Sequence, residues 1–342
     1  MASLPPLSVV VTGAAGAIGY SLMPMIASGQ MFGEGRKIDL RLLEIPAALD
    51  RLQGTVMEID DGAFNLAKLT ATADVEVAFK DVDIAIFVGG FPRKAGMERK
   101  DIQINARIFV SQAKALEDFA KKTVKVLVVA NPANTNCLSL MIGAPSIPRE
   151  NFSCLSRLDL NRSRSQLCQK YRELHPESDV TAGEIVNAMV WGNHSSTQYP
   201  DVSHCVIQTA EGPVKARDAF DDAWLDGDFM SSVQKRGGAI IKARGASSAM
   251  SAANAACNHM RDWIVGTDEC VSMGVCSDGN PYGIPEGLIY SFPVTCEDGK
   301  WKIVPGLPID DRSKGLMLAS AAELVKERDS VNEMLSAPAA AE

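Results

Sequence analysis

The stretch Ser8-Val-Val-Val-Thr-Gly13-Ala-Ala-Gly16-Ala-Ile-Gly19 joins a short apolar run to three evenly spaced glycines. The β-branched run predicts a strand buried on both faces, and residues Ile18 to Ser28 have the pattern of a helix. Glycines between a strand and a helix let the backbone turn tightly and approach a pyrophosphate, whose charge the helix N-terminus stabilises. The stretch therefore predicts a dinucleotide-binding turn. Because Ala15 stands where the usual G-x-G-x-x-G pattern has its second glycine, a plain Gly-rich turn is the alternative.

The same alternation of strand and helix continues through the first half of the chain. Apolar strand patterns recur, and longer helical patterns separate them; strands are expected at 38–43, 84–88 and 124–130, and helices at 47–64 and 99–121. Strands without polar alternation are buried on both faces, which is typical of parallel sheets built from right-handed βαβ crossovers. The sequence predicts an α/β fold with a doubly wound parallel Rossmann sheet.

After about residue 155 the pattern changes to a mixture of helices and strands. Helices are expected at 158–174, at 224–263 as one long stretch, and at 310–335; strands are expected near 184–191 and 204–209. We therefore predict two domains, a dinucleotide-binding Rossmann domain at 1–155 and an α+β catalytic domain at 156–342.

Composition narrows the class of protein. The chain has 342 residues, a net charge of −8, 46% hydrophobic and 22% charged residues, which are ordinary globular values. The acidic balance without a basic block argues against nucleic acid, and no apolar run suits a membrane span or a secretory signal. Eight cysteines without a C-x-x-C pair and four scattered histidines predict reduced thiols and no metal site. We expect a soluble cytoplasmic protein.

Three positions at the ends of the predicted parallel strands could bind ligands. Glu44 ends the second strand, where a carboxylate accepts hydrogen bonds from an adenosine ribose; its charge favours NAD over NADP, whereas a solvated strand-end glutamate is the alternative. Arg93 and Arg99 lie on a Gly/Pro-rich loop after the strand at 84–88 and could both face an anion, unless this is a basic surface loop. The sequence Asn131-Pro-Ala-Asn134 follows the next strand at the same edge of the sheet, and taken alone it favours a Pro/Asn turn over a binding site.

The second half contains three residues whose chemistry fits one reaction. Asp159 and Arg162 project from one face of a predicted helix, and His194 follows a strand-like run; an intrahelical ion pair and a structural histidine are the alternatives. Oxidation of a 2-hydroxy acid by NAD needs a base for the hydroxyl proton, and imidazole has a suitable pKa. A carboxylate would orient the ring, and a guanidinium would bind the substrate carboxylate through two hydrogen bonds.

Several long motifs in fixed order resemble the cytosolic-type, NAD-dependent malate dehydrogenases. They are the Gly-rich turn, Pro92-Arg-Lys-Ala-Gly-Met-Glu-Arg-Lys-Asp101, Asn131-Pro-Ala-Asn-Thr-Asn136, Arg157-Leu-Asp-Leu-Asn-Arg162, Trp191-Gly-Asn-His-Ser-Ser-Thr-Gln198, Arg244-Gly-Ala-Ser-Ser-Ala-Met-Ser-Ala-Ala253 and Val271-Ser-Met-Gly274. The resemblance extends from the first strand to near residue 330. It implies interconversion of malate and oxaloacetate with NAD, and a homodimer.

The resemblance also implies a role for each matching residue. His194 would be the proton acceptor and Asp159 its partner. The substrate would be bound by Arg93, Arg99, Asn131, Arg162 and Ser248. The cofactor would be bound by Gly13, Ala14, Ala15, Gly16, Ala17, Ile18, Gly19, Glu44, Asn105, Gln112, Val129, Ala130 and Asn131.

Two other functions fit parts of the sequence. A lactate dehydrogenase of the same branch would share nearly every motif, but an uncharged residue in place of Arg93 would favour pyruvate, whereas Arg93 favours oxaloacetate. A binding protein that has lost catalysis would not need Asp159, Arg162 and His194 together. Leu160, Ala130 and Glu44 depart from the common family residues, and Glu44 leaves NAD as the expected cofactor.

Overall fold

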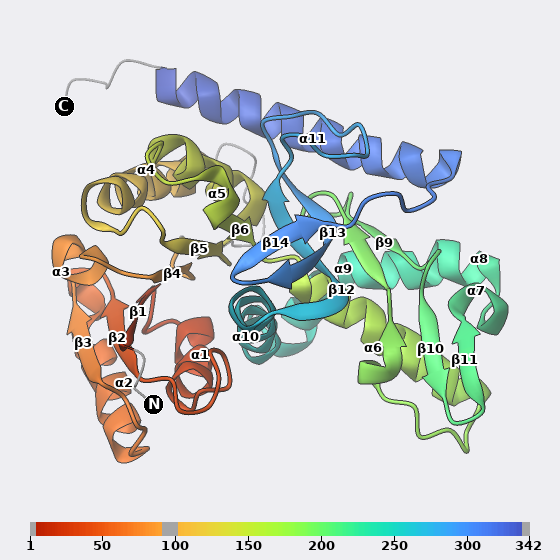
Figure 1. Cartoon of the computed structure of the whole chain (residues 1–342), viewed down its shortest axis with the longest axis horizontal. Helices are drawn as coiled ribbons and strands as arrows, with labels where there is room; N and C mark the ends of the chain where they lie inside the picture. Colours follow the sequence, from red (N-terminus) through yellow and green to blue (C-terminus); the bar gives the residue numbers. More distant parts are fainter. Residues whose placement is uncertain (1–4, 91–101, 337–342) are drawn as a thin grey trace.

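The computed structural model describes residues 5–90 and 102–336, with side chains omitted at 102–107 and 334–336. Within these residues nine strands form one sheet, in the order β14-β13-β12-β6-β5-β4-β1-β2-β3 (Figure 1). The six strands on one side of it are parallel and span Leu7–Thr12 (β1), Ile38–Leu43 (β2), Lys68–Thr72 (β3), Ile84–Phe87 (β4), Lys125–Val128 (β5) and Phe152–Cys154 (β6). The predicted doubly wound parallel sheet is confirmed.

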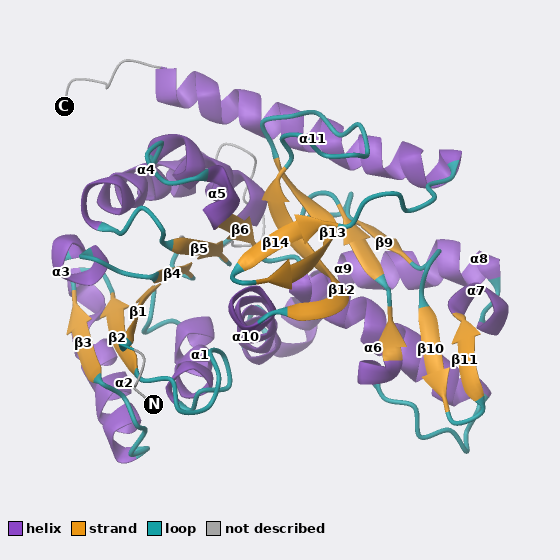
Figure 2. Ribbon diagram, in the orientation of Figure 1, coloured by secondary structure: helices purple, strands orange, loops and turns teal. Residues whose placement is uncertain are grey.

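Helices cover both faces of the parallel strands (Figure 2). One face packs against α1 (Ala17–Ala27), α2 (Leu49–Asp61) and α10 (Met250–Val265). The opposite face packs against α3 (Val75–Phe79), α4 (Ile102–Phe119) and α5 (Ala133–Gly143). Alternate residues of β1 enter the two cores, Val9 and Val11 on one side and Val10 on the other. This double burial explains why the strand has no polar alternation.

The second half adds antiparallel strands to the same sheet. Strand β12 (Thr267–Cys276) pairs with β6, and β13 (Ile289–Glu297) and β14 (Lys300–Ile303) follow it. Two smaller sheets contain β7 (Ile185–Val186), β10 (Val206–Thr209) and β11 (Gly212–Lys215), and β8 (Met189–Trp191) and β9 (Tyr199–Asp201). The other helices are α6 (Arg157–Leu174), α7 (Ala216–Ala219), α8 (Asp222–Trp224), α9 (Met230–Arg244) and α11 (Asp311–Ser336). The domain boundary at 155/156 stays a prediction.

Several expected elements differ from the structure. The long helical stretch at 224–263 is interrupted, since α9 ends at Gly245 with a φ of +70° and α10 begins five residues later. The expected strand at 184–191 is two strands of different sheets, separated by Asn187 with a φ of +57°. Strands β3, β6, β9, β11, β12, β13 and β14 were not predicted. In each case a local backbone turn or a long-range strand pairing determines the secondary structure, and neither produces a clear periodic pattern in the sequence.

Helix α11 crosses the molecule above both halves of the central sheet (Figure 1). It packs against α5 in the first half and against β9 and β13 in the second. None of the helices in the described ranges is both long enough and apolar enough to cross a membrane.

Candidate active site

The turn between β1 and α1 is shaped by backbone contacts that exclude side chains. Gly13 has a φ of +66°, and a Cβ there would lie 2.3 Å from the Cα of Gly89 at the end of β4. A Cβ on Gly19 would lie 2.6 Å from the carbonyl oxygen of Ala14, so α1 packs directly on the turn. Only glycine fits at these two positions. The turn therefore has the shape that a closely approaching pyrophosphate requires.

The same turn leaves helix N–H groups available to an anion. Gly16 is the N-cap of α1 and provides no side-chain cap, and the first turn of the helix contains no acidic residue. Beside it, the Glu44 carboxylate accepts hydrogen bonds from the backbone N–H of Ala15 (3.0 Å) and of Ile45 (3.1 Å). A positive helix terminus with a carboxylate at its edge fits the pyrophosphate and ribose of NAD.

The other predicted cofactor residues divide into those placed by the fold and those outside the described part. Val129 and Ala130 are buried after β5, and their N–H groups both donate to the Phe87 carbonyl (2.9 and 3.1 Å). The Oε1 atom of Gln112 is buried and has no hydrogen-bond partner among the described residues. Asn105 lies on α4, but its side chain falls outside the description.

The three catalytic candidates of the second half meet in one hydrogen-bonded group. The Asp159 side chain is fully buried, and its Oδ2 bonds to Nδ1 of His194 while its Oδ1 accepts from Nη1 of Arg162 at 3.1 Å. Arg162 Nη2 is 3.4 Å from the Ser248 hydroxyl, which confirms that these four residues are neighbours. Nε2 of His194 has no hydrogen-bond partner within the described residues, and the ring is 19% exposed. This nitrogen is the one available to a substrate.

The charges of this group determine its protonation. Burial raises the pKa of Asp159, but the cations of His194 and Arg162 and the Gln198 amide outweigh burial, so the net pKa is lowered. Burial lowers the pKa of His194 and Arg162 lowers it further, but the adjacent Asp159 carboxylate raises it more, so the net pKa is raised. The Asp159 carboxylate therefore favours the protonated form of the ring.

Local structure explains how these side chains reach one another. Asp159 lies in the first turn of α6, immediately after β6, and Arg162 follows one turn later on the same face. His194 lies in the loop between β8 and β9, whose pairing is anchored by the fully buried Trp191, with its Nε1 donating to Asp201 at 3.1 Å. The backbone N–H of His194 donates to Asn134 Oδ1 (3.0 Å) of α5. The group is thus held at the carboxyl ends of β5 and β6.

Some predicted site residues lie outside the part of the chain that the structure describes, and other residues of the site were not predicted from the sequence. Arg93 and Arg99 fall in the segment 91–101, which the structure does not describe, and Asn131 lies exposed just after β5. No role was predicted for Asn134 or Gln198, although both occur in the quoted motifs. Only the fold reveals that Asn134 bonds to the histidine loop. Among the described side chains, no three His, Cys, Asp or Glu residues form a metal-binding group.

The whole chain is similar to known proteins of one family. Two family models match the chain: lactate/malate dehydrogenase, NAD binding domain, at residues 7–153, and lactate/malate dehydrogenase, alpha/beta C-terminal domain, at residues 156–335. A cytoplasmic malate dehydrogenase of Beta vulgaris is 54% identical over 95% of this chain and 97% of its own length. The crystal structure of a malate dehydrogenase from Naegleria fowleri is 44% identical, with a TM-score of 0.90 and coverage of 97% and 99%. A Trichomonas vaginalis lactate dehydrogenase, solved with NADH and oxamate, is 37% identical, with a TM-score of 0.91 and coverage of 96% and 99%.

Proposed function

The chain belongs to the lactate/malate dehydrogenase family, and from this premise we propose that it interconverts (S)-malate and oxaloacetate with NAD as cofactor. The family assignment makes it an NAD-dependent oxidoreductase. Its curated relatives are named cytoplasmic malate dehydrogenases, in agreement with the cytoplasmic location expected from the sequence. The strongest support for the proposal is the hydrogen-bonded group of Asp159, Arg162 and His194.

We propose that His194 and Asp159 form the proton relay. In malate oxidation, Nε2 of His194 takes the proton of the substrate hydroxyl, because Nδ1 is already bound to Asp159. Asp159 Oδ2 keeps the ring in one tautomer and stabilises the imidazolium that forms. In oxaloacetate reduction, Nε2 returns that proton to the carbonyl oxygen. The raised pKa of His194, caused by the carboxylate against burial, suits a group that must act in both directions.

Substrate binding is assigned to cationic and polar side chains. The guanidinium of Arg162 binds the carboxylate next to the reacting carbon through two parallel hydrogen bonds, with Ser248 beside it. Arg93 and Arg99 bind the distal carboxylate, and Asn131 completes the pocket. Cationic groups at both ends of the substrate favour oxaloacetate over pyruvate, because pyruvate has no distal carboxylate to pair with Arg93 and Arg99.

The cofactor is assigned to the turn and the strand ends of the first half. When bound, NAD would supply the hydride acceptor for malate oxidation, and NADH the hydride donor for the reverse reaction. Residues 13–19 would hold the pyrophosphate through backbone N–H groups, and Glu44 would hold the adenosine ribose. Asn105, Gln112, Val129, Ala130 and Asn131 complete the set. Glu44 also repels a 2′-phosphate, which favours NAD over NADP.

Initial rates on one purified preparation test these assignments. Oxidation of NADH is measured with oxaloacetate and with pyruvate, and each is repeated with NADPH. We expect oxaloacetate with NADH to give the highest kcat/KM by at least about 100-fold, since a buried unpaired charge costs several kcal/mol. A faster rate with NADPH would refute the role of Glu44. Near-normal turnover by His194→Asn would refute the relay.

Lactate dehydrogenase activity is the second candidate, because a lactate dehydrogenase is among the solved structures that this chain resembles. The two candidates share the relay and differ at the distal end of the substrate. A preference for pyruvate in the same assay would therefore support the second candidate and remove the assignment of Arg93. No rate with any combination would support a binding protein without catalysis.

We also propose that the chain forms a homodimer. Large apolar side chains are exposed on neighbouring helices, namely Tyr20 on α1, Met57 on α2 and Met250 on α10, and α1 packs against both α2 and α10. Such exposed apolar groups on adjoining helices suit a protein interface. Sedimentation velocity tests the proposal; we expect twice the 36.6 kDa chain mass. A Met57→Glu and Met250→Glu double variant should dissociate, and a monomeric wild type would refute the dimer.

A further inference from the structure

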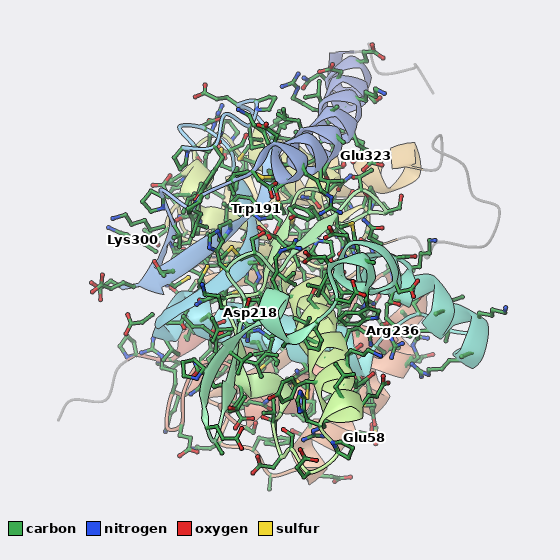
Figure 3. All side chains as sticks on the ribbon, turned by 90° about the vertical axis from the view of Figure 1, so that its right-hand side faces the viewer. Glu58, Trp191, Asp218, Arg236, Lys300 and Glu323 are labelled. Atoms are coloured by element: carbon green, nitrogen blue, oxygen red, sulfur yellow. The ribbon has the colours of Figure 1, made fainter. Side chains whose placement is uncertain are left out.

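The loop that contains His194 is bonded to the C-terminal helix α11 on both sides of the histidine. Oε2 of Glu323 accepts hydrogen bonds from three loop side chains: Asn193 Nδ2 (3.0 Å), Ser195 Oγ (2.5 Å) and Thr197 Oγ1 (2.6 Å). These donors come from alternate residues of the loop. Figure 3 labels Glu323 on α11 together with Trp191, the last residue before the loop. One carboxylate oxygen therefore fixes the segment from 193 to 197.

A second carboxylate joins the same loop to α5. Glu327, one turn along α11, accepts from Asn193 Nδ2 at 3.3 Å and from the Thr135 hydroxyl. The residue next to Thr135 is Asn134, which accepts the backbone N–H of His194. Two adjacent residues of α5 thus hold two adjacent residues of the loop, one directly and the other through Glu327.

The backbone before the histidine packs directly on α11. The Asn193 N–H donates to Ser320 Oγ at 2.8 Å, and the same hydroxyl lies 3.0 Å from Thr197 Oγ1. Gly192 has a φ of +96°, and a Cβ there would lie 2.2 Å from Ser320 Oγ. No side chain fits between this part of the loop and the helix. The contact is therefore a close-packed, hydrogen-bonded attachment.

We propose that Glu323 is a positioning residue for the proton relay: its carboxylate holds the loop at 193–197 so that Nδ1 of His194 faces Asp159 and Nε2 faces the substrate. This inference rests on the proposed function, because it assigns Glu323 a part in the same proton transfer. Glu323 acts through the loop, since its carboxylate bonds to Asn193, Ser195 and Thr197, on both sides of the histidine.

The three donors explain why this position needs a carboxylate. An ionised carboxylate only accepts hydrogen bonds, and its oxygen can accept from several donors at once. A glutamine of the same length would place an NH₂ group among the donors or lose part of its acceptor capacity. Unpaired donors would then pull the loop toward other partners, and a displacement of about 1 Å at a catalytic group can cost on the order of 100-fold in rate.

The test compares Glu323→Gln with Glu333→Gln, a matched change at an exposed position of the same helix. We expect Glu323→Gln to lower kcat for oxaloacetate reduction by about 10- to 100-fold, while the Kd for NADH changes less than about twofold. The second readout is the pKa of His194 from NMR of ¹⁵N-histidine protein, which has only four histidines to assign. This pKa should fall, because a displaced ring loses contact with Asp159, while Arg162 and burial still lower it. Glu333→Gln should match the wild type in both readouts.

Further variants distinguish positioning from charge and from simple destabilisation. Glu323→Asp keeps the charge but withdraws the carboxylate by one methylene, so both readouts should lie between those of the wild type and of Glu323→Gln. Wild-type values in Glu323→Asp would overturn the proposal in favour of charge alone. A lower melting temperature in Glu323→Gln with unchanged kcat and unchanged His194 pKa would also overturn it.

If Glu323→Gln fails to fold, Thr197→Val removes one donor and should shift both readouts in the same direction; unchanged values would overturn the proposal. The two proposals can fail separately. An inactive wild type would refute the proposed function, whereas the NMR titration tests the position of the ring without any turnover.

Discussion

Replacing Asp159 with asparagine tests the relay most directly. The substitution keeps the shape of the side chain but removes the charge from a fully buried position. It leaves the His194 ring and the Arg162 guanidinium, whose side chain is only 11% exposed, without their shared counter-charge. The protein should still fold, because the neighbouring Ser163 hydroxyl bonds to the Asp159 backbone carbonyl rather than to its side chain.

The structure sets the scale of the expected loss. Removing one partner of a buried charged pair costs about 3–5 kcal/mol. We assume that the imidazolium loses this stabilisation in the transition state. Each 1.4 kcal/mol or so corresponds to a tenfold change in rate, so kcat/KM should fall by roughly 10²- to 10³·⁵-fold. An exposed pair such as Lys114–Asp118 is worth far less, so Asp118→Asn is the matched control and should leave kcat/KM unchanged.

The pH profile gives the sign of the effect. Asp159 raises the pKa of His194, whereas burial and Arg162 lower it, so the variant should have a lower His194 pKa than the wild type. Oxaloacetate reduction needs the imidazolium, so its rate falls as pH rises through this pKa, and that limb should move to lower pH in the variant. Malate oxidation needs the neutral ring, so its acid limb should move in the same direction. Stopped-flow rates between about pH 5 and pH 9 measure both limbs.

Two results would refute this reasoning. A loss of less than about tenfold in kcat/KM would mean that Asp159 does not stabilise the imidazolium. An unchanged pH profile, even with a large loss of rate, would mean that the carboxylate serves the packing of α6 rather than the protonation of His194.

Three further predictions concern the cofactor turn and the thiols. Gly13→Ala should weaken NADH binding by at least about tenfold in fluorescence titration, because its Cβ would overlap Gly89, whereas Gly54→Ala, which meets no atom within 4 Å, should bind normally. Glu44→Gln should raise the NADPH/NADH ratio of kcat/KM by about fivefold, since it removes a like-charge repulsion of on the order of 1 kcal/mol. Ellman's reagent should label at most the half-buried Cys270 in the native protein, where burial raises the thiol pKa to about 11, and all eight cysteines after unfolding; rapid labelling of several native thiols would contradict this.

Strands β1, β2, β4 and β5 of the parallel half could be predicted because their signals are local. Buried strands, a Gly-rich turn and intervening helices each occur within short windows of sequence, and the parallel order follows from the crossovers. The three-residue spacing of Asp159 and Arg162 likewise placed them on one helical face, and the structure confirms their contact.

The antiparallel part of the sheet and the attachment of the His194 loop depend on contacts between residues far apart in the chain. Strand β12 pairs with β6, which lies more than a hundred residues earlier in the chain, and neither segment contains a sequence pattern that predicts this pairing. Glu323 occurs in a charged helix where a solvated side chain is the ordinary expectation, and its three donors lie in the loop between β8 and β9. Pairings of this kind are decided by tertiary packing, so a single sequence does not reveal them.

The continuous sheet determines which motions the molecule can use during turnover. Backbone pairing continues from β5 through β6 to β12, and Gly274 faces Cys154 so closely that a Cβ would lie 2.2 Å from its sulfur. Ser153 adds bonds to the Gly274 carbonyl (2.9 Å) and to the buried His259 (3.0 Å). Opening the two halves as rigid bodies about a hinge would break this hydrogen-bonded ladder in the dry core. Substrate entry must therefore rely on surface segments, and the two halves should denature together in one cooperative transition.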